Sequence, residues 1–242
     1  RRPTGRALPM ARPTLGTGVL PLLAAAVITG APAAASAGRL TVRIATPTGD
    51  ALSQAVVVAS PVRGTPPAVP AAAASMVQQG QSFNPAVMVV PAGARISFPN
   101  KDRMRHHIYS FSEAKRFEVR LYSGEDTPTL VFDKPGVVTL GCNIHDWMQG
   151  FIFVAPSPWF ALTGPDGTAV IEGVPDGAYE VSLWHPSLGE QTVSRKAPLA
   201  VAGDVAIDEV LPAVALVAQQ PADDDPLTAR FRRRSAPGSE AP

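Results

Sequence analysis

The stretch Gly141-Cys142-Asn143-Ile144-His145-Asp146-Trp147-Met148 places three metal-binding side chains in succession, at Cys-x-x-His-x-x-Met spacing. It holds the only cysteine of the 242 residues. Apolar runs at 137–140 and 151–154 flank it and predict strands. A thiolate and a thioether beside an imidazole are soft donors that suit copper, and a trigonal copper site takes a second imidazole. The adjacent His106 and His107 offer that second imidazole.

Each of these residue types has an ordinary structural role when it occurs alone. A single cysteine in a β protein is most often a small buried hydrophobic residue, and methionine most often fills a core. Their combination in one short stretch, with a histidine pair upstream, favours a metal site instead. Zinc also takes cysteine and histidine ligands, but methionine is a poor zinc ligand, so copper is the predicted ion.

The segment 83–154 resembles the cupredoxins, with a ligand loop of the short form seen in amicyanin. The upstream stretch from Asn100 to Ile108 is similar to the family's other ligand stretch. The resemblance implies a Greek-key β-sandwich that holds one type I (blue) copper ion. The implied ligands are His106, Cys142, His145 and Met148. The chain also resembles the cupredoxin-type methylamine utilisation proteins of bacteria, although Gly141 stands where relatives often carry a bulkier residue.

The choice between the two upstream histidines rests on two opposed observations. Counted from Asn100, the family's loop length places the ligand at His106, and His107 then supports the ligand loop. Alternation favours His107 instead, because Tyr109 and Phe111 lie on its side of the strand. We predict His106 as the ligand, with His107 as the alternative. Asn100 and Trp147 are predicted to support the ligands, and the resemblance implies that His145 faces solvent. Water exclusion is expected from Phe83, Trp147 and Phe151.

Residues 1–37 have the layout of an export signal peptide. Arginines open the segment, an apolar run covers 18–35, and Ala35-Ser36-Ala37 forms a small-x-small cleavage site. A membrane anchor is the alternative, but two prolines and the shortness of the apolar run speak against it. We therefore expect a periplasmic protein with no stable membrane span once the signal is removed.

The segment 174–179, Val-Pro-Asp-Gly-Ala-Tyr, resembles the carboxypeptidase regulatory-like domain, a small transthyretin-like β-sandwich. The matching N-terminal half of that pattern lies at 40–58. The expected organisation is therefore one discontinuous sandwich, 39–75 and 156–212, with a copper domain, 76–155, inserted into it. Two tandem β domains are the alternative. A Pro/Ala-rich linker is expected at 61–75, and a polar, disordered tail at 213–242.

Composition predicts an all-β fold, because 26 prolines and 20 glycines punctuate short apolar runs. One hairpin is expected from Val87 and Val89 to Ile96 and Phe98, across the turn at 91–93. A net charge of +1 argues against nucleic acid as a partner.

The predicted function is a carrier of single electrons, not an enzyme. Its donor and acceptor would be redox proteins, such as a c-type cytochrome or a dehydrogenase. A basic rim is expected to steer an acidic partner; its members are Lys101, Arg103, Arg105, Lys115, Arg116 and Arg120. Two alternatives stay open: a periplasmic copper store or chaperone, and a β-sandwich binding module with a vestigial site. His185, far from the motif, is predicted to be structural.

Overall fold

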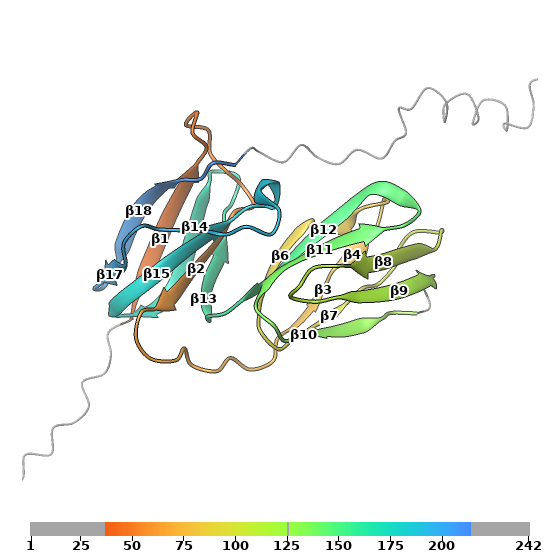
Figure 1. Ribbon diagram of the computed structural model, residues 1–242, viewed down its shortest axis with the longest axis horizontal. Coiled ribbons are helices and arrows are strands. Elements are labelled where there is room, and N and C mark those ends of the chain that lie inside the picture. Colours follow the sequence, from red (N-terminus) through yellow and green to blue (C-terminus); the bar gives the residue numbers. More distant parts are fainter. Residues whose placement is uncertain (1–36, 125, 214–242) are drawn as a thin grey trace, which may run out of the picture. The chain divides into compact units, whose positions relative to one another are not determined.

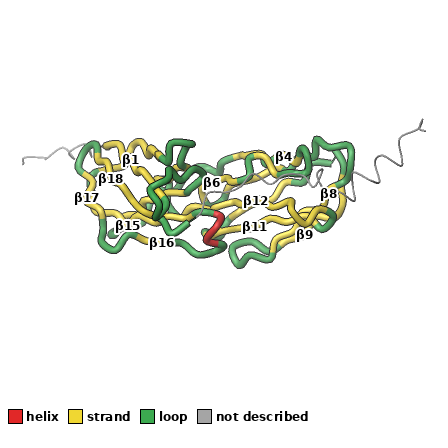
Figure 2. Tube along the Cα trace, turned by 90° about the horizontal axis from the view of Figure 1, so that it is seen from above, coloured by secondary structure: helices red, strands yellow, loops and turns green. Residues whose placement is uncertain are grey.

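The computed structural model describes residues 37–124 and 126–213. Within these ranges, strands are joined by loops, and a short 3-10 helix, η1 (Pro186–Leu188), interrupts them (Figures 1 and 2). The prediction of an all-β, cupredoxin-like sandwich is confirmed. In the same two ranges, no helix has the length and hydropathy needed to cross a bilayer.

The predicted export signal and tail fall almost entirely outside the described residues, which begin at Ala37 and end at Ala213. Ala37 itself, the last residue of the predicted signal, opens strand β1 (Ala37–Ala45) and pairs with Pro175. Cleavage after Ala37 would therefore remove only the first residue of that strand.

Strands from both sides of the 76–155 segment share two sheets, which we call the flanking sandwich. The first has the order β14-β1-β18, with β14 at Thr168–Pro175 and β18 at Val205–Val210. The second has the order β13-β2-β15-β16, with β17 also paired to β15. Their bounds are β13 Trp159–Leu162, β2 Val56–Pro61, β15 Gly177–Trp184, β16 Val193–Ser194 and β17 Leu199–Val201.

Simple alternation builds the flanking sandwich. In β1, Leu40, Val42 and Ile44 are fully buried, whereas the residues between them point outward. β1 pairs antiparallel with β14 and parallel with β18. The first and the last strand of the described residues are therefore neighbours in one sheet. Inward-facing residues of both sheets form one apolar core, which holds Val57, Ile171 and Val181 among others. The buried members of this core are thus aliphatic except for Tyr179.

The segment between these strands forms a second pair of sheets, the donor sandwich. One sheet has the order β10-β7-β3, and the other β6-β12-β11-β8-β9. The first sheet's bounds are β10 Thr129–Phe132, β7 Ala94–Ser97 and β3 Ala73–Ser75. The second sheet's bounds are β6 Val87–Pro91, β12 His145–Ala155, β11 Gly136–Cys142, β8 His106–Ser110 and β9 Phe117–Tyr122. A small ribbon pairs β4 (Val77–Gln78) with β5 (Phe83–Asn84).

Two local predictions are wrong. The expected hairpin across 91–93 does not form, because β6 and β7 belong to different sheets of the donor sandwich. β6 pairs with β12 and β7 pairs with β10, so the turn carries the chain from one sheet to the other. The expected linker at 61–75 also ends early, since Ala73–Ser75 forms β3 on the edge of β7. Backbone pairing creates this strand, and its small side chains gave no periodic signal.

A third apolar cluster joins the outer faces of the two sandwiches. Val58 and Trp184 of the flanking sandwich share it with Val87, Val137 and Phe153 of the donor sandwich. The Trp184 ring lies 5.7 Å from the Phe153 ring, measured between centroids. β2 and β12 are buried on both faces at this cluster, so the parts of these strands at 56–59 and 151–155 are continuous apolar runs instead of alternating ones.

Candidate metal centre

The Cys-x-x-His-x-x-Met stretch forms a tight hairpin between β11 and β12. Cys142 pairs with His145 across a turn of two residues, Asn143 and Ile144. His145 and Met148 therefore lie within β12 itself, whereas the sequence placed the whole stretch in a loop. The register shifts between Gly141 and Cys142, and such irregularities commonly re-aim a side chain beside a functional site. The hairpin thus fixes three candidate donors on a paired backbone.

Three donor atoms converge inside the donor sandwich. The Sγ atom of Cys142 lies 3.7 Å from Nδ1 of His145 and 4.0 Å from Nδ1 of His106. Single atoms of the three residues all lie within 4.8 Å of one another, and all three side chains are buried. The structure therefore brings together His106, Cys142 and His145. His145 is only 8% exposed, so the expectation that it faces solvent is wrong.

The two neighbouring histidines point to opposite sides of β8. His106, Ile108 and Ser110 are fully buried on the core face of this strand. His107 lies on the other face, where its Nε2 atom is 3.0 Å from a carboxylate oxygen of Glu118. The aromatic alternation that favoured His107 marks the outer face, since Phe111 is 72% exposed. The structure thus places His106, and not His107, beside the sulfur.

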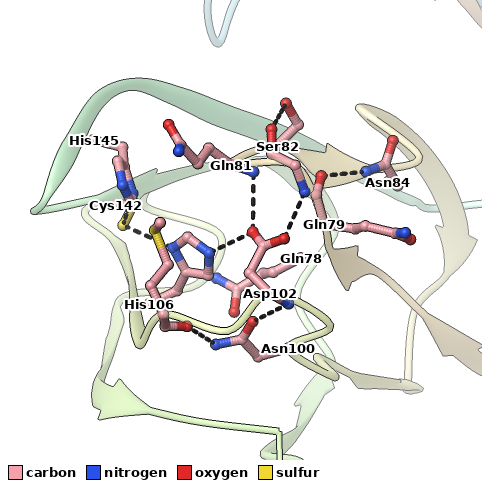
Figure 3. Close-up of polar contacts among 12 residues, drawn as sticks. Gln78, Gln79, Gln81, Ser82, Asn84, Asn100, Asp102, His106, Cys142 and His145 are labelled. Atoms are coloured by element: carbon pink, nitrogen blue, oxygen red, sulfur yellow. Dashed lines mark hydrogen bonds and ion pairs between the residues drawn. The ribbon is translucent and has the colours of Figure 1, made fainter. Parts of the chain in front are cut away.

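A carboxylate that the sequence analysis did not single out contacts the His106 ring. The His106 Nε2–H donates to Oδ2 of Asp102 at 2.7 Å, on the side of the ring away from the sulfur (Figure 3). Asn100 braces the same loop: its amide nitrogen donates to the carbonyls of Met104 and Tyr122. An aspartate four residues before the histidine was the available sequence signal, but such spacing is common in loops and did not indicate a contact.

The charges of these groups are coupled. Burial alone would raise the pKa of the Cys142 thiol, but the His106 ring and two backbone N–H groups outweigh burial and lower it. Burial opposes the charge on His106, yet hydrogen bonds to Cys142 and Asp102 raise its pKa. The pKa of His145 is lowered by burial and by the charge of His106. A thiol with a lowered pKa supplies the thiolate, which is the form that binds metals.

The remaining predicted site residues divide into two groups. Met148 and Phe83 are buried in the same core cluster as Cys142, and the Trp147 ring lies 5.3 Å from the His145 ring. Phe151, by contrast, points to the cluster between the sandwiches, where its ring lies 5.9 Å from that of Trp184. Its predicted role in excluding water from the site is therefore wrong.

Gly141 has a structural reason for lacking a side chain. A Cβ atom at this position would lie 2.6 Å from the Tyr109 ring, which comes from β8, the neighbouring strand. The Tyr109 ring thus occupies the space that a larger residue before the cysteine would fill.

His185, predicted to be structural, lies in the flanking sandwich. It is fully buried, and its Nδ1 atom accepts the backbone N–H of Ser187 at 3.2 Å, at the start of η1. Among the described residues, His106, Cys142 and His145 form the only group of three or more His, Cys, Asp or Glu side chains whose ligand atoms lie close enough together to hold a metal ion. His185 is thus not part of the donor cluster.

No family model matches the chain, and no curated protein matches it. Solved cupredoxin structures are similar to part of it. A copper-containing nitrite reductase from Thermus scotoductus SA-01 is 25% identical over 39% of this chain, with a TM-score of 0.33, and the match spans 25% of the reductase. A purple cupredoxin from Nitrosopumilus maritimus is 22% identical over 34% of this chain and 99% of its own, with a TM-score of 0.31.

A reduced amicyanin variant is 19% identical over 40% of this chain and 97% of its own, with a TM-score of 0.32. The chain thus spans about a quarter of the nitrite reductase and nearly all of the two small cupredoxins.

Proposed function

We propose that the chain binds one type I copper ion and carries single electrons between redox proteins. The ligands would be Nδ1 of His106 and His145 and Sγ of Cys142, with Met148 as a weak axial contact. The observation that carries this proposal is the convergence of two imidazole nitrogens on one buried sulfur, all within 4.8 Å. When bound, copper supplies a one-electron couple between Cu(I) and Cu(II).

The surroundings of the donors support a carrier rather than an enzyme. Catalytic metal sites keep a coordination position open for water or substrate. Here the four proposed ligands are buried together, so they would fill the coordination sphere of one ion. Paired strands hold all four, and β8, β11 and β12 belong to one sheet. A framework that holds its donors rigidly limits rearrangement when the charge of the ion changes.

The proposed setting is the periplasm, and the proposed partners are a redox protein donor and acceptor, such as a c-type cytochrome or a dehydrogenase. Lys101, Arg103 and Arg105 are exposed in the segment that leads into His106. Exposed basic side chains would attract an acidic partner, and salt would weaken the attraction. We also propose that the flanking sandwich is one discontinuous domain that carries the donor sandwich as an insertion, consistent with the shared sheets.

The spectrum of the copper-loaded protein tests this proposal. Purified protein titrated with Cu(II) should turn intensely blue or green from the thiolate-to-copper transition, saturate at one equivalent, and bleach reversibly with ascorbate. Electron paramagnetic resonance should show the narrow hyperfine splitting of a copper–thiolate site. A colourless protein that binds only Cu(I) would favour a copper store or chaperone. Preference for zinc over copper, or no metal binding at all, would reject the proposal.

A further inference from the structure

We infer that Asp102 is a positioning residue for His106, which orients the imidazole toward the metal and favours Cu(II) over Cu(I) through its negative charge. This inference rests on the proposed copper function and deepens it. It concerns a residue outside the ligand motif, in the loop before β8.

The His106 ring has partners at both ends. Its Nε2–H donates to Asp102 Oδ2 at 2.7 Å, and its Nδ1 atom faces Cys142 Sγ at 4.0 Å. A neutral imidazole carries one ring proton, and a carboxylate acceptor at Nε2 holds the proton there. Nδ1 is then left with a free lone pair on the side of the sulfur. The carboxylate thereby selects the tautomer that can bind a metal at the donor cluster.

The carboxylate is itself held in place by the backbone. Oδ1 accepts the N–H of Gly80 at 2.8 Å, and Oδ2 accepts the N–H of Gln81 at 3.0 Å (Figure 3). Both residues have left-handed backbone angles, with φ of 63° and 55°, and so present successive N–H groups to one anion. The Asp102 backbone N–H in turn donates to Oδ1 of Asn100 at 2.9 Å. A side chain held at both oxygens keeps its position whether or not a metal is bound.

Burial strengthens the effect of the Asp102 carboxylate charge on the His106 imidazole. The side chain of Asp102 is 16% exposed and that of His106 is fully buried, so little water separates the carboxylate from the imidazole. The interaction between charges strengthens as the local dielectric constant falls. A negative charge linked to a ligand through a short hydrogen bond stabilises the more highly charged ion, Cu(II), more than Cu(I). Asp102 should therefore lower the reduction potential of the site.

The neighbouring histidine offers a matched control within the same strand. Glu118 contacts His107 through the same kind of bond, 3.0 Å from Nε2, but its side chain is 62% exposed and His107 lies outside the donor cluster. Glu118→Gln therefore removes one carboxylate charge on a histidine next to the site without touching a ligand. Asp102→Asn removes the same charge at the ligand itself and keeps the shape of the side chain.

The test compares wild type, Asp102→Asn and Glu118→Gln as full chains loaded with copper. In Asp102→Asn, the ratio of Cu(II) to Cu(I) affinity should fall at least about tenfold, a rise in reduction potential of at least about 59 mV. Glu118→Gln should stay close to wild type. In the metal-free wild type, at a pH where the imidazole is neutral, long-range proton–nitrogen correlation spectra should show the His106 proton on Nε2, because no copper ion then fixes the tautomer.

The outcomes separate this inference from the proposed function. A wild type with no copper–thiolate spectrum overturns both. A wild type with that spectrum overturns the inference alone if the His106 proton of the metal-free protein lies on Nδ1, or if Asp102→Asn and Glu118→Gln shift the potential equally. The tautomer of the metal-free wild type requires no variant, so it tests the orienting role of Asp102 even if Asp102→Asn does not fold.

Discussion

The two sandwiches are built by the same strand pattern but bury different chemistry. The core of the flanking sandwich consists of aliphatic residues with one tyrosine among its buried members. The core of the donor sandwich includes Cys142 and Met148 among its aromatic and aliphatic residues, and His106 and His145 are buried beside them. Alternation alone is sufficient to form a sandwich, whereas buried polar atoms need partners, which can be other protein groups or an ion.

Two buried histidines, one in each sandwich, illustrate this difference in buried chemistry. His106 and His185 are both fully buried. The ring of His185 meets the backbone N–H and hydroxyl of Ser187, whereas the ring of His106 joins a carboxylate to a sulfur. Burial therefore does not distinguish a structural histidine from a candidate ligand, but the chemistry of its partners does.

The largest expected effect is the loss of the copper–thiolate colour when the donor sandwich, but not the flanking sandwich, is altered. Cys142→Ser should abolish the thiolate-to-copper absorption, because a serine hydroxyl stays protonated and hard where a soft thiolate is needed. His185→Ala, the control in the flanking sandwich, should leave the spectrum intact although it disturbs a buried residue. Titration with Cu(II), followed by visible absorption, measures both. A coloured Cys142→Ser protein would mean that the metal binds elsewhere.

The next effect concerns the cluster that joins the sandwiches. Trp184 is fully buried between rings of Phe151 and Phe153. Trp184→Ala should cost about 3–5 kcal/mol of unfolding free energy, the usual range for removing a large buried aromatic side chain. Urea denaturation measures the loss, and Trp184→Phe, which keeps an aromatic ring, should cost less. A loss no larger for Trp184→Ala than for Trp184→Phe would show that this cluster contributes little to stability.

A smaller effect on stability, with a clear effect on redox chemistry, is expected at Met148. Met148→Leu conserves volume in the donor-sandwich core, so its stability should change by less than about 1.5 kcal/mol. Copper binding should persist, because the thioether is only the weak axial contact, but the reduction potential should rise. Voltammetry of the loaded variant checks the sign. An unchanged potential would remove Met148 from the ligand set.

The smallest expected effect lies at the contact between β8 and β11. In Gly141→Ala the new methyl group would meet the ring of Tyr109, and the cost should be about 1 kcal/mol because the far end of that ring can shift. Tyr109→Ala should remove the penalty, so a double-mutant cycle should show coupling between the two positions. If the changes in unfolding free energy of the two substitutions were additive, the Tyr109 ring would not be the group that excludes a side chain at position 141.

Much of this architecture follows from local sequence patterns. The Cys-x-x-His-x-x-Met spacing places three candidate donors on one hairpin, so the sequence alone was enough to predict their proximity. Most strands were also predictable, because runs such as 40–44 and 117–121 alternate. Local patterns do not specify the partner of a strand, however. Residues 87–89 and 96–98 resemble a hairpin, yet their partners lie in β12 and β10.

The parts of the site that the sequence did not reveal depend on contacts between distant residues. Asp102 accepts N–H groups from Gly80 and Gln81, 22 and 21 residues earlier in the chain. No spacing rule predicts such a contact. The orientation of β8 was ambiguous for a related reason: aromatic alternation from His107 suggested a core face, whereas the fold leaves Phe111 exposed. Hydrophobicity alone could not decide which face of β8 is buried.

The central claim is that His106, Cys142 and His145 share one copper ion. A crystal structure of the copper-loaded protein, with anomalous scattering measured on both sides of the copper edge, tests it most directly. We predict a single anomalous peak within bonding distance of Sγ of Cys142 and of Nδ1 of both histidines. A peak at His107 or His185, or no peak in this cluster, would contradict the account.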